Sequence, residues 1–300
     1  MVRYRRGRAA TTAVDRLSLA VERGTITAIL GPNGAGKTST IETCEGFVRP
    51  TAGSVRVLGL DPIADRRRLM PRIGVLLQQG GAWSGVRPLE MLRHVARLHA
   101  HPLDVTMLAD RLGLRQCAGT PYRRLSGGEK QRLGLAAAIV GRPEVVFVDE
   151  PTAGLDPQAR HTTWDLFRQL AADGVSVVLS THYMDEAERL ADQVYVIDNG
   201  RVLASGSPVE LTAGTDENAL RFRGPAGLDL QSLRAALPEG YLTQEGPPGD
   251  YVVLGAIDPA LLVTVTTWCA GAGVMPDSVS VEHRTLEDVF LELTGRELRS

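Results

Sequence analysis

The sequence has only three cysteines, a formal net charge of −2 and no long hydrophobic run. The cysteines lack CxxC spacing, which is typical of reduced thiols in the cytosol. A net charge this close to zero gives no electrostatic support for a nucleic-acid-binding role. No apolar run approaches the roughly 18 residues of a membrane span, and no signal-peptide core follows Met1. We therefore expect a cytoplasmic protein with no transmembrane segment. If it serves a membrane, we expect it to do so through a partner.

The apolar residues that are present suffice for a folded core, since 43% of the 300 residues are hydrophobic and 23% are charged. Up to about residue 212, short runs rich in Val and Ile alternate with helical patterns. This alternation favours an α/β domain, residues 1–212, built around a parallel sheet. The clearest strand candidates are residues 25–30, 145–148 and 175–179.

The remaining residues, 213–300, have a different pattern, with shorter strands and loops rich in Gly and Pro. We expect a small α+β domain there, of βαββαβ order. The expected strands are residues 219–223, 251–254 and 279–282, and the expected helices lie near residues 228–237 and 258–270.

The segment GPNGAGKT, residues 31–38, follows an expected strand and opens an expected helix. This is the context of a phosphate-binding P-loop, in which glycines expose backbone N–H groups at the positive end of a helix. Lys37 is expected to reach the β- and γ-phosphates, and the Thr38 hydroxyl to ligate Mg²⁺. The predicted nucleotide-binding residues are Gly31, Pro32, Asn33, Gly34, Ala35, Gly36, Lys37, Thr38 and Ser39. A glycine-rich turn with a coincidental Lys-Thr is the simpler alternative, which the strand and helix context disfavours.

Two carboxylates, Asp149 and Glu150, stand at the end of the buried run 145–148. Asp149 suits Mg²⁺ coordination, as the usual partner of the P-loop hydroxyl. Glu150 is placed to orient and deprotonate the attacking water, a task for which a small GTPase uses Gln. An ordinary acidic turn is the alternative, and the P-loop beside it makes catalysis the better interpretation.

A second glycine-rich stretch, LSGGEKQRLG, occupies residues 125–134. Ser126 and Glu129 predict a capping box at the start of a helix. Glycine weakens a helix, so a helix start alone does not account for Gly127 and Gly128. Their N–H groups and the Ser126 hydroxyl form an anion site. If each ATP is held by one subunit's P-loop and the other subunit's serine-glycine loop, both loops are needed, and we expect a two-fold, head-to-tail dimer with two ATPs at its interface.

With these motifs in this order, the chain resembles the nucleotide-binding subunit of an ABC transporter. The resemblance implies a RecA-like core with a helical subdomain at about residues 80–140. It implies that Gln78, in IGVLLQ, lies near Mg²⁺ and beside the groove that receives a permease's coupling helix. It also implies that Asp156, in AGLD, crosses the dimer interface, and that His182, in STH, touches the γ-phosphate.

The family usually presents an aromatic ring to adenine, after an initial strand and upstream of the P-loop. Tyr4 lies at a suitable distance, but only three residues precede it. Three interpretations stay open: the strand is shortened here, the native start lies upstream, or Tyr4 is not the stacking residue.

The tail HRTLEDVFLELTGRELRS, residues 283–300, resembles that of the bacterial multidrug, daunorubicin-resistance-like branch with ABC-2 type permeases. This implies two copies of the chain on the inner face of the cell membrane, bound to a separately encoded permease that exports a drug, lipid or other hydrophobic compound. An importer ATPase and a non-transport ABC-type ATPase are the alternatives. A chromosome-structural ATPase needs a long coiled coil before the signature, and residues 79–124 show none.

The tail also predicts a helix, with Thr285 and Asp288 as a capping pair and Gly295 as its end. One face of this helix is apolar: Leu286, Val289, Phe290 and Leu293. This face either completes the core of the small domain or packs on the ATPase domain or a second copy.

Overall fold

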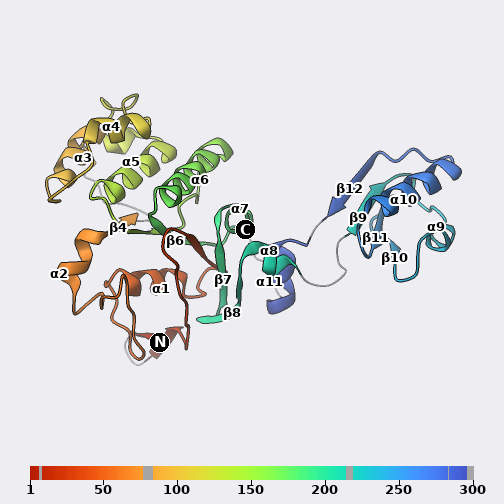
Figure 1. Ribbon diagram of the computed structural model, residues 1–300, viewed down its shortest axis with the longest axis horizontal. Coiled ribbons are helices and arrows are strands. Elements are labelled where there is room, and N and C mark those ends of the chain that lie inside the picture. Colours follow the sequence, from red (N-terminus) through yellow and green to blue (C-terminus); the bar gives the residue numbers. More distant parts are fainter. Residues whose placement is uncertain (7–8, 77–83, 214–218, 283, 296–300) are drawn as a thin grey trace. The chain divides into compact units, whose positions relative to one another are not determined.

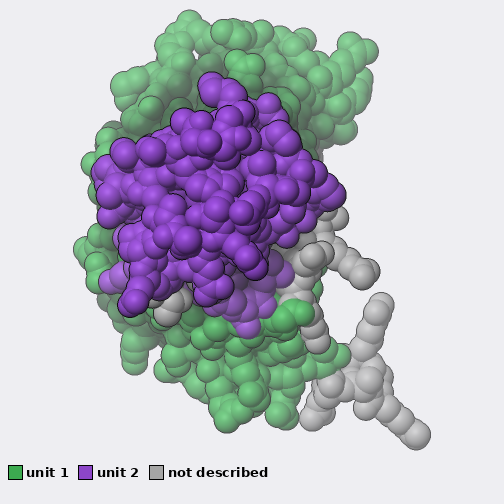
Figure 2. Space-filling view, turned by 90° about the vertical axis from the view of Figure 1, so that its right-hand side faces the viewer, with its two compact units in different colours: residues 1–208, 293–300 green, residues 209–292 purple. Residues whose placement is uncertain are grey.

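The structure is a computed structural model that describes residues 1–6, 9–76, 84–213, 219–282 and 284–295. It divides into two compact units, Met1–Pro208 with Leu293–Ser300 and Val209–Glu292, which Figure 2 shows in different colours. The functional division into domains 1–212 and 213–300 stays a prediction.

Unit 1 is built on a six-stranded sheet of order β4-β5-β6-β3-β7-β8 (Figure 1). All neighbouring strands are parallel except β7 and β8. Every residue of the central strands β3 and β6 is buried, as the Val- and Ile-rich runs predicted. The strands are β3 (Ile26–Leu30), β4 (Ile73–Leu76), β5 (Val145–Asp149), β6 (Ser176–Thr181), β7 (Gln193–Asp198) and β8 (Arg201–Gly206). The expected strands 25–30, 145–148 and 175–179 are confirmed as β3, β5 and β6, and the α/β fold with them.

The chain before this sheet forms an antiparallel hairpin of β1 (Val2–Arg6) and β2 (Ala9–Val14). Val2 and Val14 pair across it, and both side chains are buried. Tyr4 therefore lies on a strand, and that strand leads through β2 and β3 to the P-loop.

The helices of unit 1 include a group that packs together at one end of the sheet, formed by α3, α4 and α5 (Figure 1). Its interior contains Leu92, Leu108 and Leu133, all buried. The helices are α1 (Lys37–Cys44), α2 (Arg66–Leu69), α3 (Pro88–Ala96), α4 (Val105–Arg111), α5 (Gly127–Ile139), α6 (Pro157–Ala172) and α7 (Met184–Leu190). Within the described ranges, no helix is both long enough and apolar enough to cross a membrane.

Unit 2 contains an antiparallel four-stranded sheet of order β10-β11-β9-β12. The elements are β9 (Ala219–Arg223), α9 (Leu230–Ala236), β10 (Leu242–Glu245), β11 (Asp250–Leu254), α10 (Pro259–Gly271) and β12 (Ser278–Glu282). The predicted βαββαβ order is confirmed. Phe222 and Tyr251 stack at 5.0 Å between ring centroids, and Leu233 and Val265 of the two helices pack against them.

Two further helices, α8 (Pro208–Thr212) and α11 (Leu286–Thr294), flank this sheet in the sequence. The predicted start and end of α11 are confirmed: the Asp288 carboxylate accepts from the Thr285 backbone N–H at 2.8 Å, and Gly295 takes a φ of +62°. Leu286 and Phe290 are buried, whereas Leu293 is 43% exposed. The buried face of the helix is therefore shorter than the apolar pattern.

Candidate nucleotide site

The loop between β3 and α1 opens onto a pocket of about 480 Å³. The carboxyl ends of the parallel strands β3, β5 and β6 meet at this edge of the sheet, because Leu30 pairs with Thr181 and Asp149 with Ser180. The pocket is lined by Ala13, Asn33, Gly34, Gly36, Lys37, Thr38, Ser39, Glu150, Ala153 and His182. The tertiary structure thus brings the predicted P-loop, Glu150 and His182 to one place.

Glycine is required in this loop for close packing as well as for access to phosphate. Gly36 has a φ of +102°, and a Cβ atom there would lie 2.3 Å from the Ala13 carbonyl oxygen. A Cβ atom on Gly31 would lie 2.2 Å from the carbonyl oxygen of Ile197. The loop therefore sits directly against β2 and β7, which its sequence alone did not indicate.

Gly36→Ala should lower the free energy of unfolding by about 2–4 kcal/mol, because a left-handed Ala is strained and its Cβ atom clashes with backbone. Gly34→Ala is the matched control, since Gly34 has a similar φ of +84° but nothing within 4 Å of its Cβ position. The free energy of unfolding of Gly34→Ala should fall by only about 1–2 kcal/mol. Urea unfolding of both variants measures the difference, and equal losses would contradict the packing argument.

The ammonium group of Lys37 is held inside the pocket at the first residue of α1. Its Nζ donates to the Gly31 carbonyl oxygen at 2.8 Å and to the Pro32 carbonyl oxygen at 3.2 Å. It also forms an ion pair with Glu150 Oε1 at 3.2 Å. The Lys37 side chain is only 5% exposed, so these partners hold its charge and bulk water barely reaches it.

The Thr38 hydroxyl lies beside the first of the two predicted carboxylates. Its Oγ1 donates to Asp149 Oδ2 at 2.9 Å, and the Ser180 hydroxyl donates to Asp149 Oδ1. A hydroxyl and a carboxylate are hard oxygen ligands of the kind that Mg²⁺ binds in phosphate sites, so these residues fit that ion. Gln78, the third predicted ligand, lies outside the described residues.

Glu150 contacts both Lys37 and His182. Its Oε2 lies 2.5 Å from His182 Nδ1, and its Oε1 faces Lys37. The backbone at Glu150 has a φ of +51°, uncommon for a residue other than glycine. Its N–H donates to the Ser180 carbonyl oxygen at 3.1 Å, which helps to hold this conformation. Ser180 was not among the predicted site residues, although it opens the STH segment at the end of a buried run.

One buried carboxyl group near the pocket was also missed. Glu45, which follows α1, is 5% exposed, and burial together with the negative charges of Asp149 and Glu42 raises its pKa to about 7. Because the folded protein holds this proton more tightly than the unfolded chain does, the contribution of Glu45 to stability falls as pH rises from about 4.5 to about 7.

The predicted capping box of LSGGEKQRLG is confirmed. The Ser126 hydroxyl accepts from the Glu129 N–H at 3.3 Å, and the Glu129 carboxylate accepts from the Ser126 N–H at 2.7 Å. Gly127 and Gly128 also lie close to the start of α6, because Cβ atoms there would be 3.3 Å from Leu155, just before that helix, and 3.2 Å from Ala159 in its first turn. Among the described residues that line the P-loop pocket, none comes from this stretch.

Two other predicted residues have partners within the chain. The Asp156 carboxylate caps α6 by accepting from the Ala159 N–H at 2.9 Å. The Tyr4 hydroxyl donates to Ser39 Oγ at 3.1 Å, so this side chain, 41% exposed, stands beside the helix that follows the P-loop. Stacking of Tyr4 on adenine stays a prediction.

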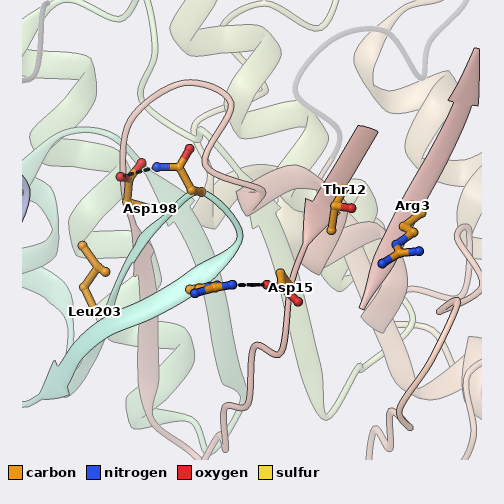
Figure 3. A pocket seen from close by; sticks show the side chains of 7 residues that line it. Arg3, Thr12, Asp15, Asp198 and Leu203 are labelled. Carbon is orange, nitrogen blue, oxygen red and sulfur yellow. Dashed lines mark hydrogen bonds and ion pairs between the residues drawn. The ribbon is translucent and has the colours of Figure 1, made fainter. Parts of the chain in front are cut away.

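A separate pocket of about 440 Å³ lies between the β1–β2 hairpin and the turn joining β7 to β8 (Figure 3). Arg201 binds Asp15 there, with its Nε 2.9 Å from Oδ2, and Asn199 donates to Asp198 at 2.7 Å. The Arg201 guanidinium lowers the pKa of Asp15. Arg201 and Asp15 neutralise each other and Asp198 is hydrogen-bonded to Asn199, so we assign this pocket no chemistry.

A P-loop lysine paired with a carboxylate just after β5, with a histidine beside it, is the arrangement of a P-loop enzyme that hydrolyses a nucleotide. A model of the ABC transporter family matches residues 14–153. The Nod factor export ATP-binding protein I of Ralstonia nicotianae is 39% identical, covering 96% of this chain and 91% of its own length. The daunorubicin/doxorubicin resistance ATP-binding protein DrrA of Streptomyces peucetius is 35% identical, covering 95% and 88%.

Solved structures have the same fold. The ATP-binding subunit of an ABC transporter matches with a TM-score of 0.60 and 26% identity, covering 66% of this chain and 85% of its own. A dimeric ATP-binding cassette bound to ADP and phosphate matches with a TM-score of 0.62 and 23% identity, covering 68% and 94%. The chain belongs to the ABC transporter family. It is an ATP-binding subunit and hydrolyses ATP.

Proposed function

We propose that this subunit powers export of a drug, lipid or other hydrophobic compound through a separately encoded membrane permease. The relatives named for Nod factor export or daunorubicin resistance align with nearly the whole chain, including the small C-terminal unit. The observation that carries the ATPase role is the contact of Glu150 with both Lys37 and His182 in the P-loop pocket.

Each residue of the site has a proposed role in binding ATP. Backbone N–H groups of the loop from Gly31 to Ser39 bind the phosphates of ATP, and Tyr4 faces adenine. Thr38, Asp149 and Gln78 would hold Mg²⁺, which would supply positive charge to the phosphate oxygens.

Lys37 and Glu150 exchange partners when ATP binds. The Lys37 ammonium group, now paired with Glu150 Oε1 at 3.2 Å, moves its charge to the β- and γ-phosphates. Glu150 is then free to accept the proton of the attacking water as a general base. His182, already 2.5 Å from Glu150 Oε2, orients that carboxylate and contacts the γ-phosphate.

Transport is coupled to hydrolysis through a homodimer. Ser126, Gly127, Gly128 and Asp156 of one copy contact the ATP held by the P-loop of the other. These contacts exist only in the closed dimer, so ATP favours closure and its hydrolysis favours reopening. The permease receives this motion beside Gln78, which places the dimer at the inner face of the cell membrane.

Inside-out vesicles that carry this chain and its permease should accumulate a hydrophobic drug such as daunorubicin when ATP is added outside. The ATP then reaches the subunit, and export drives the drug into the vesicle lumen. Fluorescence quenching of the drug measures uptake. Vesicles with Lys37→Ala should show no ATP-driven uptake, because the phosphates lose their cation. ATP-driven release of preloaded compound would instead identify an importer.

A further inference from the structure

A buried acid joins three segments around the catalytic pocket. Glu186, in the first turn of α7, is 0% exposed. Its Oε1 accepts from the Thr152 hydroxyl at 2.9 Å and from Trp164 Nε1 at 3.0 Å. A carboxyl group buried in this way is costly unless partners satisfy it. Burial raises the pKa of Glu186, although the hydrogen bonds from Thr181, Trp164 and Thr152 lower it in part.

Two of the segments joined here follow the residues proposed to react, Glu150 and His182. Strands β5 and β6 pair side by side as far as Asp149 and Ser180, where the pairing of the two strands ends. Beyond that point, one cross-connection is Glu150 to His182 and the next is Thr152 to Glu186. Thr152 lies two residues after Glu150, and α7 begins two residues after His182.

We propose that Glu186 is a positioning residue for hydrolysis, which acts through Thr152 to hold the Glu150 carboxylate against His182. The Trp164 indole fixes the Glu186 carboxyl group to α6, so the acid is a firm anchor for the loop after Glu150. This inference rests on the proposed roles of Glu150 and His182. It adds that the hydrogen bond between Thr152 and Glu186 supports the same hydrolysis reaction.

A purely structural role makes a different prediction. Neither Thr152 nor Glu186 is among the residues that line the P-loop pocket, and Thr152 is 0% exposed. Loss of their hydrogen bond therefore leaves the contacts to ATP in place but loosens the general base. A structural bond would affect stability alone, whereas a positioning bond affects kcat with KM for ATP unchanged.

The test is Thr152→Val in the full chain, which removes the hydroxyl and keeps the shape. We expect kcat for ATP hydrolysis to fall about tenfold, the effect of a slightly misplaced general base. Thr152→Ser and Glu186→Gln keep a donor and an acceptor, so both should retain the wild-type kcat. Thr163→Val is the matched control, because Thr163 is 2% exposed and its hydroxyl donates only within its own helix, to the Ala159 carbonyl oxygen at 2.9 Å.

A wild-type kcat for Thr152→Val overturns the proposal, and so does an equal fall for Thr163→Val. A fall for Thr152→Ser and Glu186→Gln that matches Thr152→Val also overturns it, since the hydrogen bond would not be the cause. Nucleotide binding by each variant shows that it is folded. Glu150→Gln, assayed beside them, tests the proposed role of Glu150 separately from the positioning role of Glu186. Normal hydrolysis by that variant would overturn the proposed role of Glu150 itself.

Discussion

Glu150→Gln should lower ATP turnover by at least about 10²-fold while ATP binding is retained. The amide keeps the size of the side chain and its contact with His182, but it cannot accept the proton of the attacking water. Binding depends on the loop and Lys37, which this change leaves in place. Loss of the ion pair with Lys37 also removes a competitor for that ammonium group, so the variant should bind ATP at least as well as the wild type.

The variant should also accumulate an ATP-bound dimer, because closure no longer ends in hydrolysis. Steady-state phosphate release measures turnover, and sedimentation with ATP measures the dimer. Glu144→Gln is a suitable control, since Glu144 precedes the same strand but pairs with Arg72 at 2.5 Å, away from the pocket. It should hydrolyse ATP normally. Near-normal hydrolysis by Glu150→Gln would remove Glu150 from the role of general base.

Ser126→Arg should abolish ATP-driven dimerisation but spare ATP binding by the single subunit. The P-loop of the same chain is untouched, since Ser126 is not among the residues that line its pocket. In the proposed dimer, however, the arginine side chain fills the place where the partner's ATP must lie. Lys37→Ala should have the opposite defect, because it loses the phosphate contact within its own chain.

A mixture of the two variants tests the shared site directly. The P-loop of Ser126→Arg and the serine-glycine loop of Lys37→Ala are both intact, so a mixed dimer has one complete site. Sedimentation with ATP should show a dimer in the mixture that neither variant forms alone. If Ser126→Arg lost nucleotide binding as fully as Lys37→Ala, the shared-site model would be wrong.

Loss of the helix cap is the main complication of Ser126→Arg, since an N-cap residue contributes about 0.5–2 kcal/mol. Asp104→Arg provides the matched control. Asp104 is exposed and caps α4 by accepting from the Met107 N–H at 2.7 Å, so this variant also exchanges a cap for an arginine. It should still form the ATP-driven dimer, which would assign the loss in Ser126→Arg to the proposed interface.

The sequence by itself determined the features that depend on neighbouring residues. The P-loop was predicted because its glycines, lysine and threonine act within one strand-loop-helix unit. The capping boxes at Ser126 and Thr285 were predicted because each joins residues three apart. The βαββαβ order of residues 219–282 followed from short apolar runs separated by Gly and Pro, and that pattern is local too.

Only the tertiary structure decided how these units meet, since that depends on which strands pair and in which register. The pairing of Asp149 with Ser180 brings the serine hydroxyl onto the Asp149 carboxylate, a contact that the local STH segment does not indicate. The fit of Gly36 against Ala13 depends on the path of β2 beside the loop. The bond between Thr152 and Glu186 joins residues 34 apart, whose polar side chains would each be ordinary surface groups in an extended chain. Packing buries that pair, because α6 and α7 contact each other and both contact β6, the neighbour of β5.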